Sequence, residues 1–261
     1  MYDYHMHSRV SFDAHDTGEM LVRAAEKAGL KEICFTDHMD YVRGQTEQPM
    51  IFTEADYSRE YDGLESATVK IRRGMEYGLY PDNQEQMKWD IARRNYDFVL
   101  GSIHFVDDLD VYFAEYWQDK TIYQAQRQYL EEMLTCVQVH EDFDVLAHMT
   151  FLQKGVGCPE KKPMPYADHR EILDEILRLL AAKGKGLELN TSGVDRCGGY
   201  LPTADFFRRF RELGGEIVTV GSDAHTSDRV GQYTREACQV LKEIFGYVCT
   251  FENRQPIFHK L

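Results

Sequence analysis

The residues with the clearest capacity for chemistry stand near the start of the chain, in the sequence His5-Met6-His7. Successive side chains of a β-strand point to opposite faces, so residues two positions apart share a face. If residues 2–7 are extended, His5 and His7 point the same way and are close enough to bind one metal ion. Because a His-x-His sequence also occurs by chance, this interpretation depends on what the rest of the chain supplies.

Further histidines and acids recur where later strands are expected to end. The strand-end set is His5, His7, His38, Glu76, His104, His148, Asp223 and His225. Six of the ten histidines belong to it, and so many convergent imidazoles would repel each other if charged and pack poorly if neutral. Imidazole and carboxylate groups suit zinc, iron or manganese. Eight or nine ligands exceed the needs of one ion, so the sequence predicts two or three ions, bridged by Glu76 and Asp223.

A repeated succession of strand and helix must position these residues. Strands are expected at 2–7, 32–36, 69–77, 97–103, 144–147, 186–189 and 216–220. Helices are expected at about 16–27, 53–66, 82–94, 121–138, 167–183, 205–213 and 229–245, and a last short strand in the tail 246–261. Capping-box spacing at Asp16–Glu19 opens the first helix, and Gly29 closes it.

Seven alternations of strand and helix imply a parallel sheet, because parallel neighbours need helical crossovers. In a closed barrel the site is built at the C-terminal ends of several strands, whereas an open sheet concentrates ligands at one switch point. Ligand-type residues end the first five predicted strands and the seventh. This even spread favours a closed barrel of about seven units.

Composition and charge exclude several classes of function. The net charge of −14 argues against general nucleic-acid binding, which depends on Lys and Arg to neutralise phosphates. No apolar run approaches the roughly 20 residues of a membrane span, and residues 1–4 lack the character of a signal peptide. Six scattered cysteines without a Cys-x-x-Cys pair indicate reduced thiols. We therefore expect one cytoplasmic domain over residues 1–261, without nucleic-acid or membrane partners; the sequence indicates no oligomeric state.

The ligand residues stand in recognisable motifs. In chain order these are His5-x-His7, Thr36-Asp37-His38, Gly74-Met75-Glu76, Ser102-Ile103-His104, Ala147-His148 and Ser222-Asp223-Ala224-His225. Together they resemble the polymerase-and-histidinol-phosphatase (PHP) superfamily over essentially the whole chain. The resemblance implies a distorted, TIM-like (β/α)7 barrel with a trinuclear metal centre at the C-terminal ends of the strands.

The resemblance also implies which residues share an ion. One ion would be held by His5, His7, Glu76 and Asp223, the second by Glu76, His104 and His148, and the third by His38 and His225. The third ion is expected to have a further ligand six residues after His7, where Asp13 stands. Many relatives have histidine at that place, so His15 is the alternative, and Asp13 is preferred.

Within the superfamily, the size of the chain and the segments Gly101–Asp107 and Asp110–Phe113 resemble the histidinol-phosphate phosphatase branch. That branch implies hydrolysis of L-histidinol phosphate to L-histidinol in histidine biosynthesis. A bridging water, acidified to hydroxide, would attack phosphorus directly, and Asp223 or His225 would relay a proton to the leaving alkoxide. The alternatives are a PHP phosphoesterase for another small phosphate ester and a non-enzymatic metal-binding barrel.

A phosphorylated substrate should also meet a cation from the loops. Arg196, in the loop after the sixth strand, is the first choice because Arg binds phosphate bidentately. The other candidates are Lys161 and Lys162 in the loop after the fifth strand, with Arg9 and Arg43 near ligand loops. The acidic loop after His104 carries Asp107, Asp108, Asp110 and Glu115, and it is expected either to receive the amine and imidazole of the substrate or to be solvated.

Overall fold

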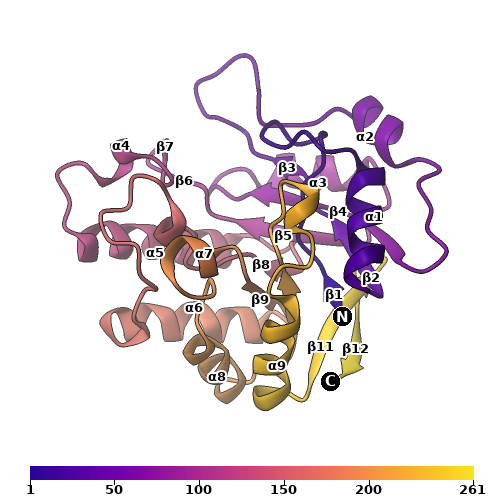
Figure 1. The fold of residues 1–261 in the computed structure, drawn as a ribbon. Coiled ribbons are helices and arrows are strands. Elements are labelled where there is room, and N and C mark those ends of the chain that lie inside the picture. The colour runs from indigo at the N-terminus through magenta and orange to yellow at the C-terminus, as the bar shows by residue number, and fades with distance from the viewer.

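Parallel strands form the centre of the molecule (Figure 1). The computed structural model describes residues 1–261, and its strands are β1 (Tyr2–Asp3), β2 (Glu32–Phe35), β3 (His38–Met39), β4 (Lys70–Gly78), β5 (Phe98–Ser102), β6 (Phe105–Val106), β7 (Leu109–Asp110), β8 (Val145–Leu146), β9 (Gly186–Asn190), β10 (Val218–Gly221), β11 (Tyr247–Glu252) and β12 (Gln255–Lys260). The main sheet runs in the order β1-β2-β4-β5-β8-β9-β10, with every neighbouring pair parallel.

The two ends of this sheet meet. The N–H group of Tyr4 donates to the Val220 carbonyl at 2.9 Å, and that of Asp223 donates to the His5 carbonyl at 2.8 Å. These bonds join the chain after β1 to β10 and its continuation. The sheet is therefore a nearly closed barrel of seven strands, which confirms the fold class predicted from the sequence.

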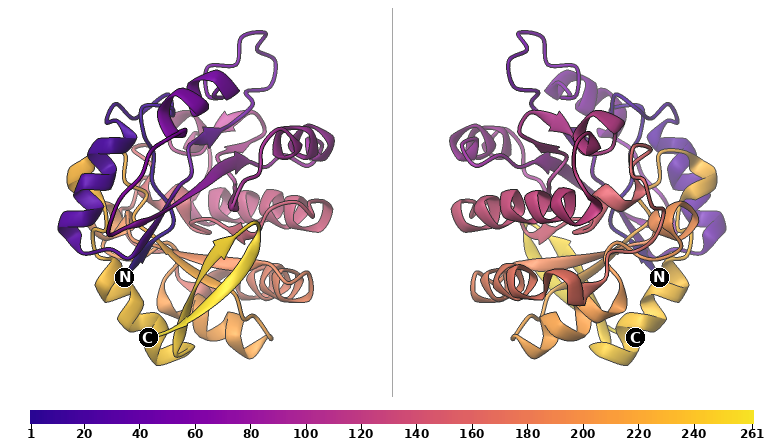
Figure 2. Two further views of the ribbon diagram at one scale, coloured as in Figure 1. Left: turned by 90° about the vertical axis from the view of Figure 1, so that its right-hand side faces the viewer. Right: turned by 90° about the vertical axis from the view of Figure 1, so that its left-hand side faces the viewer.

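Helices form an outer ring around the strands (Figure 2). They are α1 (Gly18–Ala28), α2 (Glu54–Tyr61), α3 (Gln84–Ala92), α4 (Ala114–Trp117), α5 (Ile122–Val139), α6 (Arg170–Ala182), α7 (Gly193–Cys197), α8 (Ala204–Glu212) and α9 (Thr234–Ile244), with 3-10 turns η1 (Phe151–Lys154), η2 (Tyr166–His169) and η3 (Ser227–Arg229). Each predicted helical segment contains a helix, but the ends differ. The helix predicted over 53–66 ends at Tyr61, before Gly63 takes a positive φ of 87°. No helix is both long and apolar enough to span a membrane.

The first helix shows a small error in the predicted cap. Its N-cap is Thr17, whose hydroxyl accepts a hydrogen bond from the Met20 N–H at 3.2 Å, rather than Asp16. The Asp16 carboxylate instead accepts from the Ser227 N–H at 2.6 Å and so ties the start of α1 to η3. The predicted end is correct: Gly29 adopts the left-handed conformation, with φ of 68°, that closes many helices.

The short helices α4 and α7 and three features of the strands were not predicted. The second predicted strand is interrupted after β2 and continues as β3, in which His38 pairs with Glu76 of β4. Strands β6 and β7 form a small antiparallel hairpin after His104. The tail forms an antiparallel hairpin, β11–β12, rather than the single strand expected there.

The β11–β12 hairpin, drawn in yellow, lies across one end of the barrel (Figure 2). Phe251 from β11 is buried against Phe98, with ring centroids 4.7 Å apart, and its N–H donates to the Tyr4 hydroxyl at 3.0 Å. These residues belong to a cluster of eight buried side chains inside the barrel, separate from the 54 buried residues of the main core. The hairpin therefore fills the N-terminal end of the barrel, opposite the end where the predicted ligands lie.

Candidate metal centre

The nine predicted ligands come together at the C-terminal end of the barrel. They are supplied by the segments after β1, β5, β8 and β10, by β3 and β4, and by the loop before α1. A cavity of about 540 Å³ opens there, and seven of the nine line it, namely Asp13, His38, Glu76, His104, His148, Asp223 and His225. His5 and His7 are fully buried beneath it. The structure therefore brings the residues predicted at strand ends into one site, together with Asp13 from the loop before α1.

Glu76 lies at the centre of the cluster and is completely buried. Its Oε1 atom is 2.7 Å from His148 Nε2 and 3.3 Å from His104 Nε2. Its Oε2 atom is 3.2 Å from His5 Nε2 and 3.2 Å from His38 Nδ1. One carboxylate therefore faces imidazoles from four different segments, which is the placement that a bridging ligand needs.

The electrostatics of the cluster keep its acids ionised. Burial alone would raise the pKa of Glu76, but the charges of His5 and His104 hold that pKa well below its usual value. The pKa of Asp223 is likewise low, because Lys154 and His5 outweigh the effect of burial. Both carboxylates are thus available as anionic ligands.

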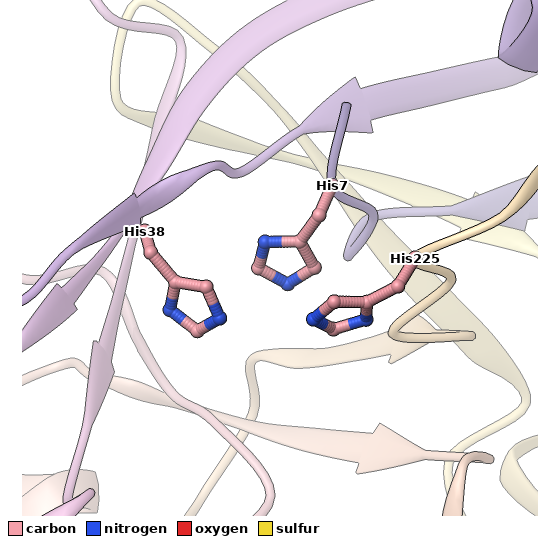
Figure 3. A group of neighbouring side chains, drawn as sticks. All are labelled: His7, His38 and His225. Atoms are coloured by element: carbon pink, nitrogen blue, oxygen red, sulfur yellow. The ribbon is translucent and has the colours of Figure 1, made fainter. Parts of the chain in front are cut away.

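Three histidines face one another on one side of the cluster (Figure 3). The ring centroid of His7 lies 4.3 Å from that of His38 and 4.2 Å from that of His225. The Asp13 carboxylate is 3.1 Å from His225 Nε2 and 3.7 Å from His38 Nε2. His15 is exposed and does not line the cavity, so the geometry favours Asp13 as the fourth member.

The choice between Asp13 and His15 can be tested directly. We expect Asp13→Ala to lower both the bound metal and the turnover, because it removes an oxygen ligand from the His38 and His225 pair. The variant His15→Ala should leave both nearly intact. Elemental analysis and steady-state kinetics on the two proteins check this, and the reverse pattern would move the ligand to His15.

The residues present fit divalent metal ions. Four groups each bring their ligand atoms within 4.8 Å of one another: His5, His7 and Asp223; His5, Glu76 and His148; His7, His38 and His225; and His38, Asp40 and His104. Glu76 Oε2 and His104 Nε2 are buried without a hydrogen-bond partner, which is costly unless an ion takes that role. The donor set of imidazole and carboxylate is the one that zinc, iron and manganese accept.

Several residues that support the ligands were missed by the sequence reasoning. Asp40 accepts from both His104 Nδ1 at 2.8 Å and His38 Nδ1 at 3.0 Å. A Cβ atom at Gly78 would lie 2.2 Å from Asp40 Oδ1, so this strand glycine leaves the carboxylate its space. On the other side of the cluster, Ser11 Oγ is 3.0 Å from His7 Nδ1. The sequence signal for Asp40 was its position two residues after His38, but it was read as part of a loop.

Three cationic side chains line the cavity, Lys154, Arg196 and Arg229, and Arg229 pairs with Asp195. Arg196 in α7 lines it, as predicted, and is exposed. Lys154, at the end of η1, also lines it; its ammonium group pairs with Asp223 and donates to Ser192 Oγ at 3.0 Å. Lys154 was missed because its loop was expected to act through Lys161.

The remaining predicted substrate residues do not reach the cavity. Lys161 is exposed and donates to the Gly155 carbonyl. Arg43 pairs with Asp82 and stacks 4.3 Å above the Tyr80 ring, because these partners lie nearer than the ligand loops do. The two weaker candidates are also paired elsewhere, Arg9 with Glu60 and Lys162 with Glu160.

The acidic loop after His104 is divided between the two expectations for it, and Asp107 does not reach the cavity. Asp107 and Asp108 form the turn of the β6–β7 hairpin with positive φ values of 49° and 62°. Asp107 is exposed and accepts from Gln128 Nε2 at 2.5 Å. Asp110, at the end of β7, lines the cavity beside Phe113. The hairpin turn thus carries Asp107 away from the site and leaves Asp110 in it.

The comparison with known proteins agrees with this site. Residues 3–192 match the family model described as the PHP domain. The chain is 33% identical over 256 residues to a histidinol-phosphatase of Lactococcus lactis, covering 96% of this chain and 94% of that protein. It is 29% identical over 270 residues to a probable histidinol-phosphatase of Clostridium acetobutylicum, covering 99% and 96%.

A crystal structure of histidinol phosphate phosphatase from Lactococcus lactis, complexed with zinc, L-histidinol and phosphate, superposes with a TM-score of 0.87. The sequence identity to it is 30%, and 98% of each chain is covered. The family model and these whole-length similarities lead to one conclusion: this chain belongs to the PHP domain family, among its histidinol-phosphatase relatives.

Proposed function

We propose that the protein is a metal-dependent phosphomonoesterase that hydrolyses L-histidinol phosphate to L-histidinol and phosphate. The observation that carries this proposal is the cluster of nine ligand residues around Glu76 at the floor of the cavity. It is supported by the whole-length similarity to a protein of that activity, whose structure holds zinc, L-histidinol and phosphate. The reaction belongs to histidine biosynthesis, and we place the protein in the cytoplasm.

The proposed centre holds two to three ions of zinc, iron or manganese. Its ligands are His5, His7, Asp13, His38, Glu76, His104, His148, Asp223 and His225. Glu76 lies beside both His5 and His104, so it would be shared by the first two ions. Asp13 lies beside His225 and would bind the third. When bound, such ions supply Lewis acidity and lower the pKa of water to near neutral.

Side chains around the proposed metal centre are candidates for proton transfer. Asp223 and His225 line the cavity and are our candidates for relaying the proton lost by the attacking water to the leaving alkoxide. Lys154 donates to Asp223, so its ammonium group can resupply that proton. No Ser, Cys or Asp nucleophile is needed for direct attack by water.

The two ends of the substrate have opposite charges, and the cavity offers matching groups. Arg196 and Lys154 are placed to meet the phosphate. Asp110, whose Oδ1 atom accepts from the Tyr112 N–H at 2.8 Å, is the acid we assign to the cationic end. Phe113, which is 49% exposed at the same wall, offers an aromatic surface to an imidazole ring.

The role of Arg196 leads to a quantitative prediction. A hydrogen bond to a charged group contributes roughly 1.5–3 kcal/mol, and each 1.36 kcal/mol is about tenfold in rate. Arg196→Ala should therefore lower kcat/KM for histidinol phosphate about ten- to a hundredfold, with the metals retained. Lys161→Ala is the matched control, since its ammonium group lies outside the cavity, and it should change little. An unchanged kcat/KM in the Arg196 variant would remove that residue from the site.

The substrate is tested by competition between phosphate esters. Kinetics on histidinol phosphate, a nucleoside monophosphate and a sugar phosphate should be compared at equal metal loading. We expect histidinol phosphate to have the highest kcat/KM. If another ester is preferred, the wider phosphoesterase assignment alone survives. If no ester is hydrolysed, including a generic aryl phosphate with manganese, the protein is a metal-binding barrel without this activity.

A further inference from the structure

The sixth strand of the barrel, β9, contributes none of the nine proposed ligands, yet it carries a buried acid. Glu188 is only 1% exposed and does not line the cavity, so substrate does not touch it. A buried carboxylate is costly unless hydrogen bonds satisfy it. The partners of Glu188 therefore show what it does.

Glu188 forms hydrogen bonds with two proposed ligands, the side chain of His5 and the backbone of His148. Its Oε1 atom lies 2.7 Å from His5 Nδ1. Its Oε2 atom accepts from the His148 N–H at 2.8 Å and from Asn190 Nδ2 at 3.2 Å. The carboxylate thus links the segments after β1 and β8 from the strand that lies between β8 and β10.

The neighbouring strand, β10, leaves space for the contact between Glu188 and His5. A Cβ atom at Gly221 in β10 would lie 2.2 Å from Glu188 Oε1 and 2.3 Å from His5 Cβ. Any larger residue would displace one member of the pair. The absence of a side chain at Gly221 therefore leaves the space in which His5 and Glu188 meet.

We propose that Glu188 is a positioning residue that fixes a proton on His5 Nδ1 and so directs His5 Nε2 to the metal. A neutral imidazole carries one N–H, and the nitrogen without it is the ligand. His5 Nε2 faces Glu76 Oε2 and His7 Nε2, each at 3.2 Å, which is the side of the proposed ions. Histidine ligands commonly donate their other N–H to a carboxylate. This inference rests on the proposed metal centre.

The variant Glu188→Gln tests the proposal without changing the size of the side chain. Two N–H groups face Oε2, so the single amide oxygen is expected to take that place. The amide NH₂ then faces His5 Nδ1, which must accept, and the proton moves to Nε2, where it blocks metal binding. Loss of such a partner typically weakens metal affinity about 10- to 100-fold. We expect a decrease of that size in zinc affinity, measured by competition with a chelator.

A buried carboxylate elsewhere in the barrel provides the matched control. Glu32 in β2 is 7% exposed and accepts from the Tyr4 hydroxyl at 2.6 Å and from Arg72 Nε at 2.8 Å, away from the ligands. Glu32→Gln should leave zinc affinity unchanged. Wild-type affinity in Glu188→Gln, or an equal loss in Glu32→Gln, would overturn the proposal, because the effect would then be absent or merely one of packing.

A second readout observes the proton itself. Nitrogen-15 NMR of histidine-labelled protein, with the His5 signal assigned from a His5→Asn variant, should show a proton on Nδ1 in the wild type and its loss in Glu188→Gln. The two proteins are compared at equal zinc loading, and an unchanged proton position would contradict the proposal. A wild type that binds no zinc would instead refute the metal centre, and failure on histidinol phosphate alone would refute only the substrate.

Discussion

Replacing Glu76 with glutamine is expected to reduce kcat/KM about a thousandfold or more and to lower the metal content by at least one ion. The carboxylate offers one oxygen to His104 and His148 and the other to His5 and His38. An amide has one oxygen and no charge, so it cannot serve both sides. Metal ions supply several kcal/mol of transition-state stabilisation, and about 1.36 kcal/mol corresponds to a tenfold change in rate.

Ser102 provides the comparison for this variant. Its hydroxyl donates to Glu76 Oε1 at 2.6 Å and contacts none of the proposed ions' other ligands. Ser102→Ala should retain the metals and lose far less activity than Glu76→Gln. Elemental analysis and kinetics on both proteins are sufficient. If Glu76→Gln kept its full metal content and more than about a tenth of the wild-type kcat/KM, Glu76 would not be a bridge.

Removal of the metal ions is expected to abolish activity and to lower the melting temperature by about 10–20 °C. An ion present at about 100 times its Kd stabilises the folded state by about 2.7 kcal/mol. Two such ions contribute about 5 kcal/mol, and about 1 kcal/mol shifts the Tm of a domain of this size by about 2–4 °C. When the ions leave, Glu76 Oε2 and His104 Nε2 stay buried without a hydrogen-bond partner.

This second effect is measured by calorimetry of chelator-treated protein before and after zinc is restored. The Glu76→Gln protein is the control, because it should regain only part of the shift. Equal melting temperatures with and without zinc would show that the ligand cluster binds no ion tightly, whatever its geometry.

The fold was predictable where the sequence carries a long periodic signal. Helix α5 was predicted within one residue at each end, and Thr121 forms the capping box that opens it. Strands of two residues, such as β3, are too short to show any period. The β11–β12 turn was missed because Asn253 and Arg254 adopt positive φ without the Asn-Gly pair that usually marks such turns.

The candidate site was predictable from the sequence only in part. The proposed ligands could be grouped from the sequence because parallel strands of one barrel all end at the same side of it. The substrate residues depend on long-range partners that no local pattern reveals. Arg43 pairs with Asp82, and the hairpin turn at Asp107 and Asp108 leaves Asp107 outside the cavity and Asp110 in its lining.

The closure of the barrel has a consequence for how the protein is made. His5 and His7 are synthesised well before the Val220 carbonyl that accepts from Tyr4, in the last strand of the ring, and before Asp223 just after that strand. Pairings between such distant parts of a chain carry a loop-closure cost and form late. On the ribosome, His5 and His7 cannot meet Asp223 until β10 has emerged. We therefore expect metal binding to follow closure of the barrel rather than to nucleate its folding.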